Sequence, residues 1–241
     1  WVQGIGGSLY VDGPSIAPVA ESLDTYTEER TDYNREQQFG GWASAGDGCD
    51  VRQSILRRDM VTYKVREDDG CTVVTGILED LYSGEVIDFQ HSNYPTKGAG
   101  DSSTVQIDHI IPLFAGLNGG AWEWTKEERV AFANDPENLM ASKGRENGSK
   151  SDQLFGAWQP TNESFHCLYV AQMVWVLDKY DLAVLDSDRI AMVEKLNTCV
   201  LPDTGVAPEP VPADTVVATD APAVEETEAP VEAPNVAPYV N

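Results

Sequence analysis

Three polar residues near the middle of the chain could together hydrolyse a phosphate ester. Asp108 and His109 are adjacent at the end of an apolar, β-branched run, and Asn147 follows in a short polar segment. Carboxylate and amide oxygens suit Mg²⁺ or Mn²⁺, whereas a site without Cys is a poor one for structural zinc. A neutral His beside such an ion can deprotonate a water molecule that attacks phosphorus. The pattern therefore indicates metal-assisted hydrolysis, with Asp108 and Asn147 as expected ligands and His109 as the expected general base.

These residues need particular elements to bring them together. The sequence predicts a strand over 105–112, a short strand beginning at Asn138, and a helix over about 143–154. Side chains alternate along a strand, so Asp108 and His109 should face opposite sides. Taken singly, a His on an apolar strand is more often a packed core residue, and an Asn is more often a turn or cap residue. The informative feature is therefore the order of Asp108, His109, Asn138 and Asn147 along the chain.

Local patterns predict the remaining elements. A helix follows Asp50, a candidate N-cap, and a capping box formed by Thr125 and Glu128 opens another. Residues 1–30 contain several Gly and Pro and show little periodicity, so they are expected to be irregular. The predicted elements are a helix over 50–59, a β-hairpin over 71–89, a helix over 125–132, a buried helix over 164–179, and an amphipathic helix over 186–198 capped by Asp186 or Ser187.

The motif resembles the HNH (ββα-metal) nucleases. The residues that carry the likeness are Asp108-His109-Ile-Ile-Pro-Leu, Asn138-Leu and Asn147-Gly-Ser-Lys150-Ser-Asp152. The nearest likeness is to the secreted bacterial branch related to the C-terminal domain of modification-dependent GmrSD-type restriction enzymes, and the HNH domain of the CRISPR effector nuclease is similar. It extends over roughly residues 35–200, through Cys49-Asp-Val-Arg52, Gly70-Cys71, Trp124, Arg129, Phe132-Ala-Asn134-Asp135, Trp158-Gln-Pro160 and Cys167-Leu-Tyr169.

This resemblance implies an α+β fold with a ββα-metal core, an additional β-hairpin and packed helices. Asp108 and Asn147 would bind Mg²⁺, or Mn²⁺ or another divalent cation, and His109 would be the general base. Asn138 would orient the loop and the His, and Asn147 stands where many members of the family have His. The products would be a 5′-phosphate and a 3′-hydroxyl.

Two cations are candidates for contact with the substrate phosphate. Lys150 lies within the last part of the motif, and Arg129 lies in the predicted helix over 125–132. For each, the alternative is an ordinary solvated surface charge.

The four Cys residues indicate two disulfides. The sequence has no C-x-x-C pattern, which argues against a zinc ribbon or a thioredoxin-type redox site. Of the three possible pairings, the most local joins Cys49 to Cys71 and Cys167 to Cys199; four free thiols are the alternative. Disulfides would place the protein outside a reducing cytoplasm, so we expect it to be secreted or located in the cell envelope.

The chain is strongly acidic, with a formal net charge of −24 over 241 residues. Taken alone, this argues against nucleic-acid binding, yet local basic runs around Lys143, Arg145 and Lys150, together with a bound divalent cation, can form a cationic groove. Residues 202–241 hold eight acidic residues and no Lys or Arg. We therefore predict an irregular lead-in over 1–34, a nuclease domain over 35–200 and a disordered acidic tail over 201–241.

The sequence thus predicts a monomeric endonuclease of low sequence specificity acting on double-stranded DNA, with RNA a further possible substrate. No stretch is long and apolar enough to span a membrane. The alternatives are a non-catalytic binding or surface protein that has kept the scaffold, and a phosphodiesterase with another substrate. A third is a toxin nuclease that requires an inhibitor or immunity protein as a partner.

Overall fold

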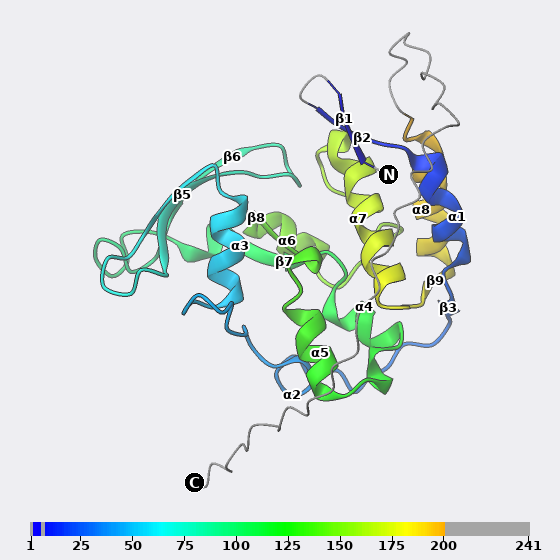
Figure 1. Cartoon of the computed structure of the whole chain (residues 1–241), viewed down its shortest axis with the longest axis horizontal. Coiled ribbons are helices and arrows are strands. Elements are labelled where there is room, and N and C mark those ends of the chain that lie inside the picture. The colour runs from blue at the N-terminus through cyan, green and yellow to red at the C-terminus, as the bar shows by residue number, and fades with distance from the viewer. Residues whose placement is uncertain (1, 6–7, 201–241) are drawn as a thin grey trace, which may run out of the picture. The chain divides into compact units, whose positions relative to one another are not determined.

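The computed structural model describes residues 2–5 and 8–200, which combine helices and strands in an α+β fold (Figure 1). The predicted acidic tail over 201–241 lies outside the described residues. The strands are β1 (Val2–Ile5), β2 (Ser8–Val11), β3 (Thr25–Tyr26), β4 (Thr62–Val65), β5 (Val73–Glu79), β6 (Val86–Gln90), β7 (Val105–His109), β8 (Leu139–Lys143) and β9 (Val184–Leu185). The helices are α1 (Gly13–Ser22), α2 (Arg35–Phe39), α3 (Val51–Asp59), α4 (Leu113–Asn118), α5 (Lys126–Ala133), α6 (Gly144–Lys150), α7 (His166–Lys179) and α8 (Asp186–Thr198).

Helices α1, α7 and α8 lie side by side (Figure 1), and they share the larger hydrophobic core with residues of α4 and α5 such as Leu117 and Phe132. Ile16 of α1, Val174 of α7 and Leu196 of α8 are all completely buried in it. Gly13 lets α1 approach α8 closely: its amide donates to Cys199 O at 2.8 Å, and a Cβ there would lie 1.9 Å from Leu196 O. The N-terminal segment therefore differs from the irregular lead-in that was predicted, because tertiary packing on α8 orders a helix with little sequence periodicity.

The second core lies between α3 and two sheets. Strands β4, β5 and β6 form an antiparallel sheet in that order, and β7 pairs with β8 in a separate antiparallel pair. Ile55 and Leu56 of α3 pack among the buried residues of both sheets. The predicted hairpin is thus present as β5 and β6, and β4 adds a third strand that the sequence patterns did not indicate.

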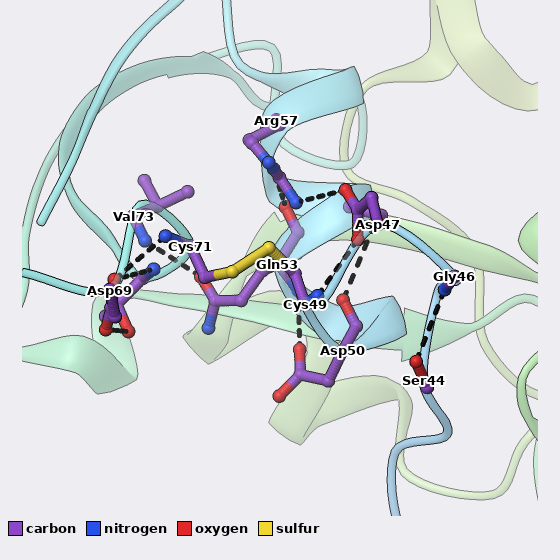
Figure 2. A network of polar contacts seen from close by, with 12 residues as sticks. Ser44, Gly46, Asp47, Cys49, Asp50, Gln53, Arg57, Asp69, Cys71 and Val73 are labelled. Carbon is purple, nitrogen blue, oxygen red and sulfur yellow. Dashed lines mark hydrogen bonds and ion pairs between the residues drawn. A yellow bond between two sulfur atoms is a disulfide. The ribbon is translucent and has the colours of Figure 1, made fainter.

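A disulfide and a set of helix-cap contacts fix the start of α3 (Figure 2). The Asp50 side chain accepts a hydrogen bond from Gln53 N at 2.9 Å, as expected for an N-cap. Cys49 is bonded to Cys71, and Gln53 Oε1 accepts from Val73 N at 2.8 Å. The loop before α3 is therefore tied to the chain that enters β5.

The antiparallel pair of β7 and β8, with α6 directly after β8, carries residues of the predicted motif. Its outer edge is covered by side chains, because Ala141 N donates to Asp59 Oδ2 at 2.7 Å and Lys143 N donates to Asp80 Oδ1 at 2.8 Å. Helix α6 is shorter than the predicted 143–154: it ends at Lys150, where Ser151 takes a left-handed conformation with φ of 53°. Within the described ranges, no helix is long and apolar enough to cross a membrane.

Other boundaries differ in smaller ways. The strand predicted over 105–112 ends at His109, and the turn after it leads into α4, because Pro112 cannot donate a ladder hydrogen bond and instead precedes the helix. Helix α5 has the predicted capping box, with Thr125 and Glu128 bonded reciprocally. Helix α8 begins after Leu185 and has no side-chain cap, so neither Asp186 nor Ser187 serves as one; Asp186 lies in the first turn.

Candidate active site

Strand β7 presents Asp108 and His109 on opposite faces. In the antiparallel register Asp108 is paired with Met140 and His109 with Leu139. The Asp108 side chain contacts α6 through Lys150, whereas the His109 ring contacts the end of α5 and Trp42. This follows from the alternation of side chains along a strand, and it divides the site into a helix-facing side and an outer side.

Asn138 fixes the chain as it leaves β7. It is completely buried at the end of the 3-10 turn Pro136–Asn138, directly before β8. Its Oδ1 accepts from Ile111 N at 2.8 Å, and its Nδ2 donates to Ile111 O at 3.2 Å. The backbone of Asn138 also accepts from Ile110 N at 2.8 Å. The residue therefore holds the turn that follows His109 without facing solvent.

The helix-facing side is a buried ionic cluster. Asp108 is 4% exposed and Lys150 is 0% exposed. Lys150 Nζ lies 3.0 Å from Asp108 Oδ1 and donates to His109 O at 2.8 Å. Tyr82 donates its hydroxyl proton to Asp108 Oδ2 at 2.5 Å, within an aromatic group that includes Tyr169. Lys150 thus neutralises a buried carboxylate, which leaves it no exposed atom for a substrate phosphate.

Burial shifts the pKa values of Lys150 and Tyr82 in this cluster. Desolvation lowers the pKa of Lys150 from its usual value, and the neighbouring Asp108 carboxylate acts in the opposite sense. Desolvation also raises the pKa of Tyr82 well above its usual value, and the charge of Asp108 adds to that effect. The Tyr82 hydroxyl therefore stays protonated and acts as a hydrogen-bond donor to Asp108.

Asn147 lies over the same face of β7 as Asp108. Its Nδ2 donates to Gln106 Oε1 at 2.9 Å, and Gln106 precedes Asp108 by two positions, so both point toward α6. Lys150 follows Asn147 by about one helical turn and contacts Asp108. The structure therefore brings Asn147 to the helix-facing side, with its Oδ1 directed to no hydrogen-bond donor among the described residues.

Asp108 and Asn147 carry the type of oxygen atom that a hard divalent cation binds, and both oxygens of Asp108 already have protein partners. A carboxylate has about four acceptor positions, of which Asp108 uses some for Tyr82 and Lys150, and Asn147 contributes an amide oxygen. Mg²⁺ commonly binds through one or two protein oxygens and keeps several waters. Within residues 2–5 and 8–200, no three His, Cys, Asp or Glu side chains form a group that could hold a metal. A cation at Asp108 would therefore share that carboxylate with Lys150.

The outer side holds His109 in one tautomer. His109 Nε2 lies 2.9 Å from Ala133 O, and a carbonyl oxygen can only accept, so Nε2 carries the proton. Nδ1 is then unprotonated and can accept a proton. The Trp42 ring stacks parallel to the imidazole, with 5.9 Å between ring centroids and an interplanar angle of 4°. The Ala133 carbonyl and Trp42 together fix the plane and the orientation of the ring.

His109 is neutral over the ordinary pH range. Desolvation lowers its pKa to about 3, the hydrogen bond to Ala133 O opposes this, and the nearby charges of Arg35 and Lys150 lower it further. An anionic phosphodiester beside the ring would raise the pKa, because an opposite charge stabilises the imidazolium form. The imidazole of His109 is thus unprotonated, and an anion bound beside it would make it more basic.

A hollow of about 480 Å³ opens on the outer side of His109. Arg35 and Trp42 line it together with the imidazole. Neither residue stood out in the sequence, because both precede the motif by more than sixty positions and only the tertiary fold places them beside it. Arg35 falls at the first position of α2, after the Asn34 N-cap, and this local signal carries no functional information.

Arg129 has a structural role, because its side chain donates hydrogen bonds to backbone carbonyls. Its guanidinium donates to Gln38 O at 3.1 Å and to Ala121 O at 3.2 Å, and also to the carbonyl of Trp124. It thereby ties α5 to α2. With these carbonyl contacts made, the side chain is oriented toward the protein rather than toward a substrate.

The cysteines form both of the most local pairs. Cys49 is bonded to Cys71, and Cys167 is bonded to Cys199. The second bond joins the start of α7 to the residue that follows α8. Neither bond contributes an atom to the hollow or to the ionic cluster.

Comparison with known proteins identifies the family of this chain. The model of the C-terminal domain of the GmrSD restriction endonucleases matches residues 50–195. The chain belongs to this family. The match contains β7, β8 and α6, and hence Asp108, His109, Asn138 and Asn147. Arg35 and Trp42 lie before it, so this GmrSD-type domain completes its outer side with residues outside the matched segment.

A relative from Arthroderma benhamiae, described as an uncharacterized secreted protein, is 33% identical over 169 residues. The matched region covers 69% of this GmrSD-type chain and 76% of the relative. No solved structure matches the chain.

Proposed function

We propose that this protein is a secreted, metal-dependent HNH endonuclease that hydrolyses phosphodiester bonds of DNA with little sequence specificity. The observation that carries the proposal is the state of His109: its Nε2 donates to Ala133 O, which leaves Nδ1 unprotonated, and the residue lines a hollow of about 480 Å³. An oriented, neutral imidazole that lines a hollow is an arrangement from which a general base can act. Membership of a nuclease family gives this chemistry its substrate class.

In this proposal β7, β8 and α6 are a ββα-metal core, and the domain spans residues 35–200. Asp108 and Asn147 would hold Mg²⁺ or Mn²⁺, and the bound ion would supply positive charge to stabilise the phosphate and the leaving oxygen. His109 Nδ1 takes a proton from water as the water oxygen bonds to phosphorus. The P–O3′ bond breaks, and the 3′-oxygen takes a proton from solvent, giving a 5′-phosphate and a 3′-hydroxyl. Asn138 keeps the turn after His109 in place.

The location outside the cell rests on two observations. The chain contains two disulfides, which persist in oxidising compartments. Its relative carries the description of a secreted protein. We further propose double-stranded DNA as the partner and a monomer as the active form.

A substrate panel tests the proposal. Purified protein is incubated with supercoiled plasmid, single-stranded RNA and bis(p-nitrophenyl) phosphate, each with Mg²⁺, Mn²⁺ or EDTA. We expect nicked and linear plasmid with either ion, and none in EDTA. Hydrolysis of the small ester without any cleavage of DNA would instead indicate a phosphodiesterase with another substrate.

The buried ion pair favours one alternative, a binding module that has kept the scaffold. Lys150 already neutralises Asp108 in the absence of a divalent cation. Such a module would bind DNA in EDTA and leave plasmid intact with every ion. The same panel, combined with a gel-shift measurement, separates it from a nuclease.

A further inference from the structure

Arg35 lines the hollow beside His109 and has no role in the mechanism proposed above. It is exposed at the surface. Half of the sixteen Lys and Arg residues form ion pairs with carboxylates, among them five arginines: Arg30, Arg57, Arg58, Arg66 and Arg189. Among the described residues Arg35 forms no ion pair and no side-chain hydrogen bond. A free guanidinium next to the proposed base is therefore available to an anion.

The neighbouring charges favour Arg35 as the anion-binding group of this hollow. Arg30, five positions earlier, is held by Asp32 at 2.9 Å and lies over the Trp122 ring. Glu36 also lines the hollow, so the hollow contains one carboxylate beside the guanidinium. Arg35 is the one Lys or Arg among the described residues that line it.

The cations suggested by the motif are unsuited to this task. Lys150 is completely buried against Asp108, and Arg129 donates to backbone carbonyls. A nuclease with a net charge of −24 repels its polyanionic substrate over most of its surface. A cation beside the proposed base would offset that repulsion, and Arg35 is the one Lys or Arg among the described residues that line the hollow.

We propose that Arg35 binds the substrate phosphodiester in the hollow above His109. This inference rests on the proposed nuclease function and adds its phosphate-binding residue. The planar guanidinium donates two parallel hydrogen bonds to the non-bridging oxygens, as arginine does with phosphates. One wall of the hollow is the stacked pair of Trp42 and His109, so a phosphate held by Arg35 has its phosphorus next to the imidazole that activates water.

The test compares Arg35→Gln, Arg35→Lys and the wild type. Lys97→Gln is the matched control, because Lys97 is an exposed loop lysine outside the hollow and its replacement changes the net charge equally. Binding of a short fluorescent DNA duplex is measured by anisotropy in EDTA over a salt series, and plasmid cleavage is measured with Mg²⁺. Melting temperatures verify that each variant is folded, which the exposure of Arg35 leads us to expect.

We expect Arg35→Gln to lower kcat/KM by about 10- to 100-fold, since a hydrogen bond to a charged group has that effect. The slope of log affinity against log salt should fall by about one phosphate contact. Arg35→Lys should restore part of the affinity, because it keeps the charge and loses the bidentate geometry. Lys97→Gln should match the wild type.

Two results would overturn the inference in different ways. If Arg35→Gln binds and cuts like the wild type while His109→Ala does not cut, Arg35 is not the phosphate contact and the nuclease proposal stands. If the wild type neither binds nor cuts nucleic acid with any ion, the nuclease proposal fails, and the role of Arg35 fails with it.

Discussion

Two adjacent residues of β7 have different neighbours because strand side chains alternate. Asp108 points toward α6, where Lys150 and Tyr82 satisfy its carboxylate. His109 points the other way, where Ala133 O and Trp42 orient its ring. A shift of one residue in the register of β7 and β8 would exchange these environments, placing the imidazole beside Lys150 and the carboxylate beside Trp42.

Removing the buried ammonium should be costly. We expect Lys150→Met to lower the free energy of unfolding by about 3–5 kcal/mol in EDTA, because it leaves the Asp108 charge buried without its partner. Mg²⁺ should then stabilise this variant more than the wild type, since the ion supplies the missing positive charge. Urea unfolding with EDTA and with Mg²⁺ measures both effects.

Lys143→Met is the matched control for that experiment. Lys143 is the last residue of β8, directly before α6, and it pairs with the exposed carboxylate of Glu85. Its loss should change the free energy of unfolding by less than about 1 kcal/mol. Equal stability of the Lys150→Met variant and the wild type in EDTA would contradict the ionic account of the cluster.

The low pKa of His109 predicts a loss of stability in acid. Its folded pKa is about 3 and its unfolded pKa is 6.5, so the unfolded state binds the proton first. The contribution of neutral His109 is complete above pH 6.5 and is lost as the pH falls from 6.5 toward 3. Between pH 8 and pH 5, in EDTA, the wild type should lose about 2 kcal/mol more than His109→Asn. Parallel pH profiles of the two proteins would show that the imidazole titrates normally.

At the scale of elements, the turn after β7 depends on one amide side chain. Asn138→Ala removes both hydrogen bonds to Ile111 and leaves a buried N–H unpaired, which should cost about 1–3 kcal/mol. Because the turn begins directly after His109, kcat should also fall by about 100-fold while KM changes little. Asn118→Ala is the control: Asn118 is also buried, donates to Phe114 O and accepts from Arg30 N, at the end of α4. If both variants lost stability and neither lost kcat, Asn138 would have a structural role alone.

The order of these elements was predictable from short-range patterns, whereas the surroundings of the site were not. Asp50 and the pair of Thr125 and Glu128 cap helices as local rules indicate. The burial of Lys150 and the proximity of Arg35 to His109 depend on contacts between segments that are distant along the chain. Helix α1 was missed for the same reason, since its packing on α8 rather than its own periodicity orders it.

For the whole molecule, the disulfide between Cys167 and Cys199 stabilises a layer that does not contact the hollow. Replacing both residues by Ser should lower the free energy of unfolding by about 3–4 kcal/mol, because the unfolded chain gains freedom over a separation of 32 residues. The kcat measured well below the melting temperature should stay at the wild-type value. A large fall in kcat of the folded variant would show that the helical layer and the site are coupled.

The most direct test of the account is plasmid nicking by the wild type, His109→Ala and His91→Ala in Mg²⁺, with folding verified by circular dichroism. His91 is the matched control, since it lies in a loop and its Nδ1 accepts from Asn93 N. We predict that the wild type and His91→Ala nick plasmid and that folded His109→Ala loses at least about 100-fold in rate. Equal nicking by His109→Ala and the wild type would contradict the assignment of His109 as the general base.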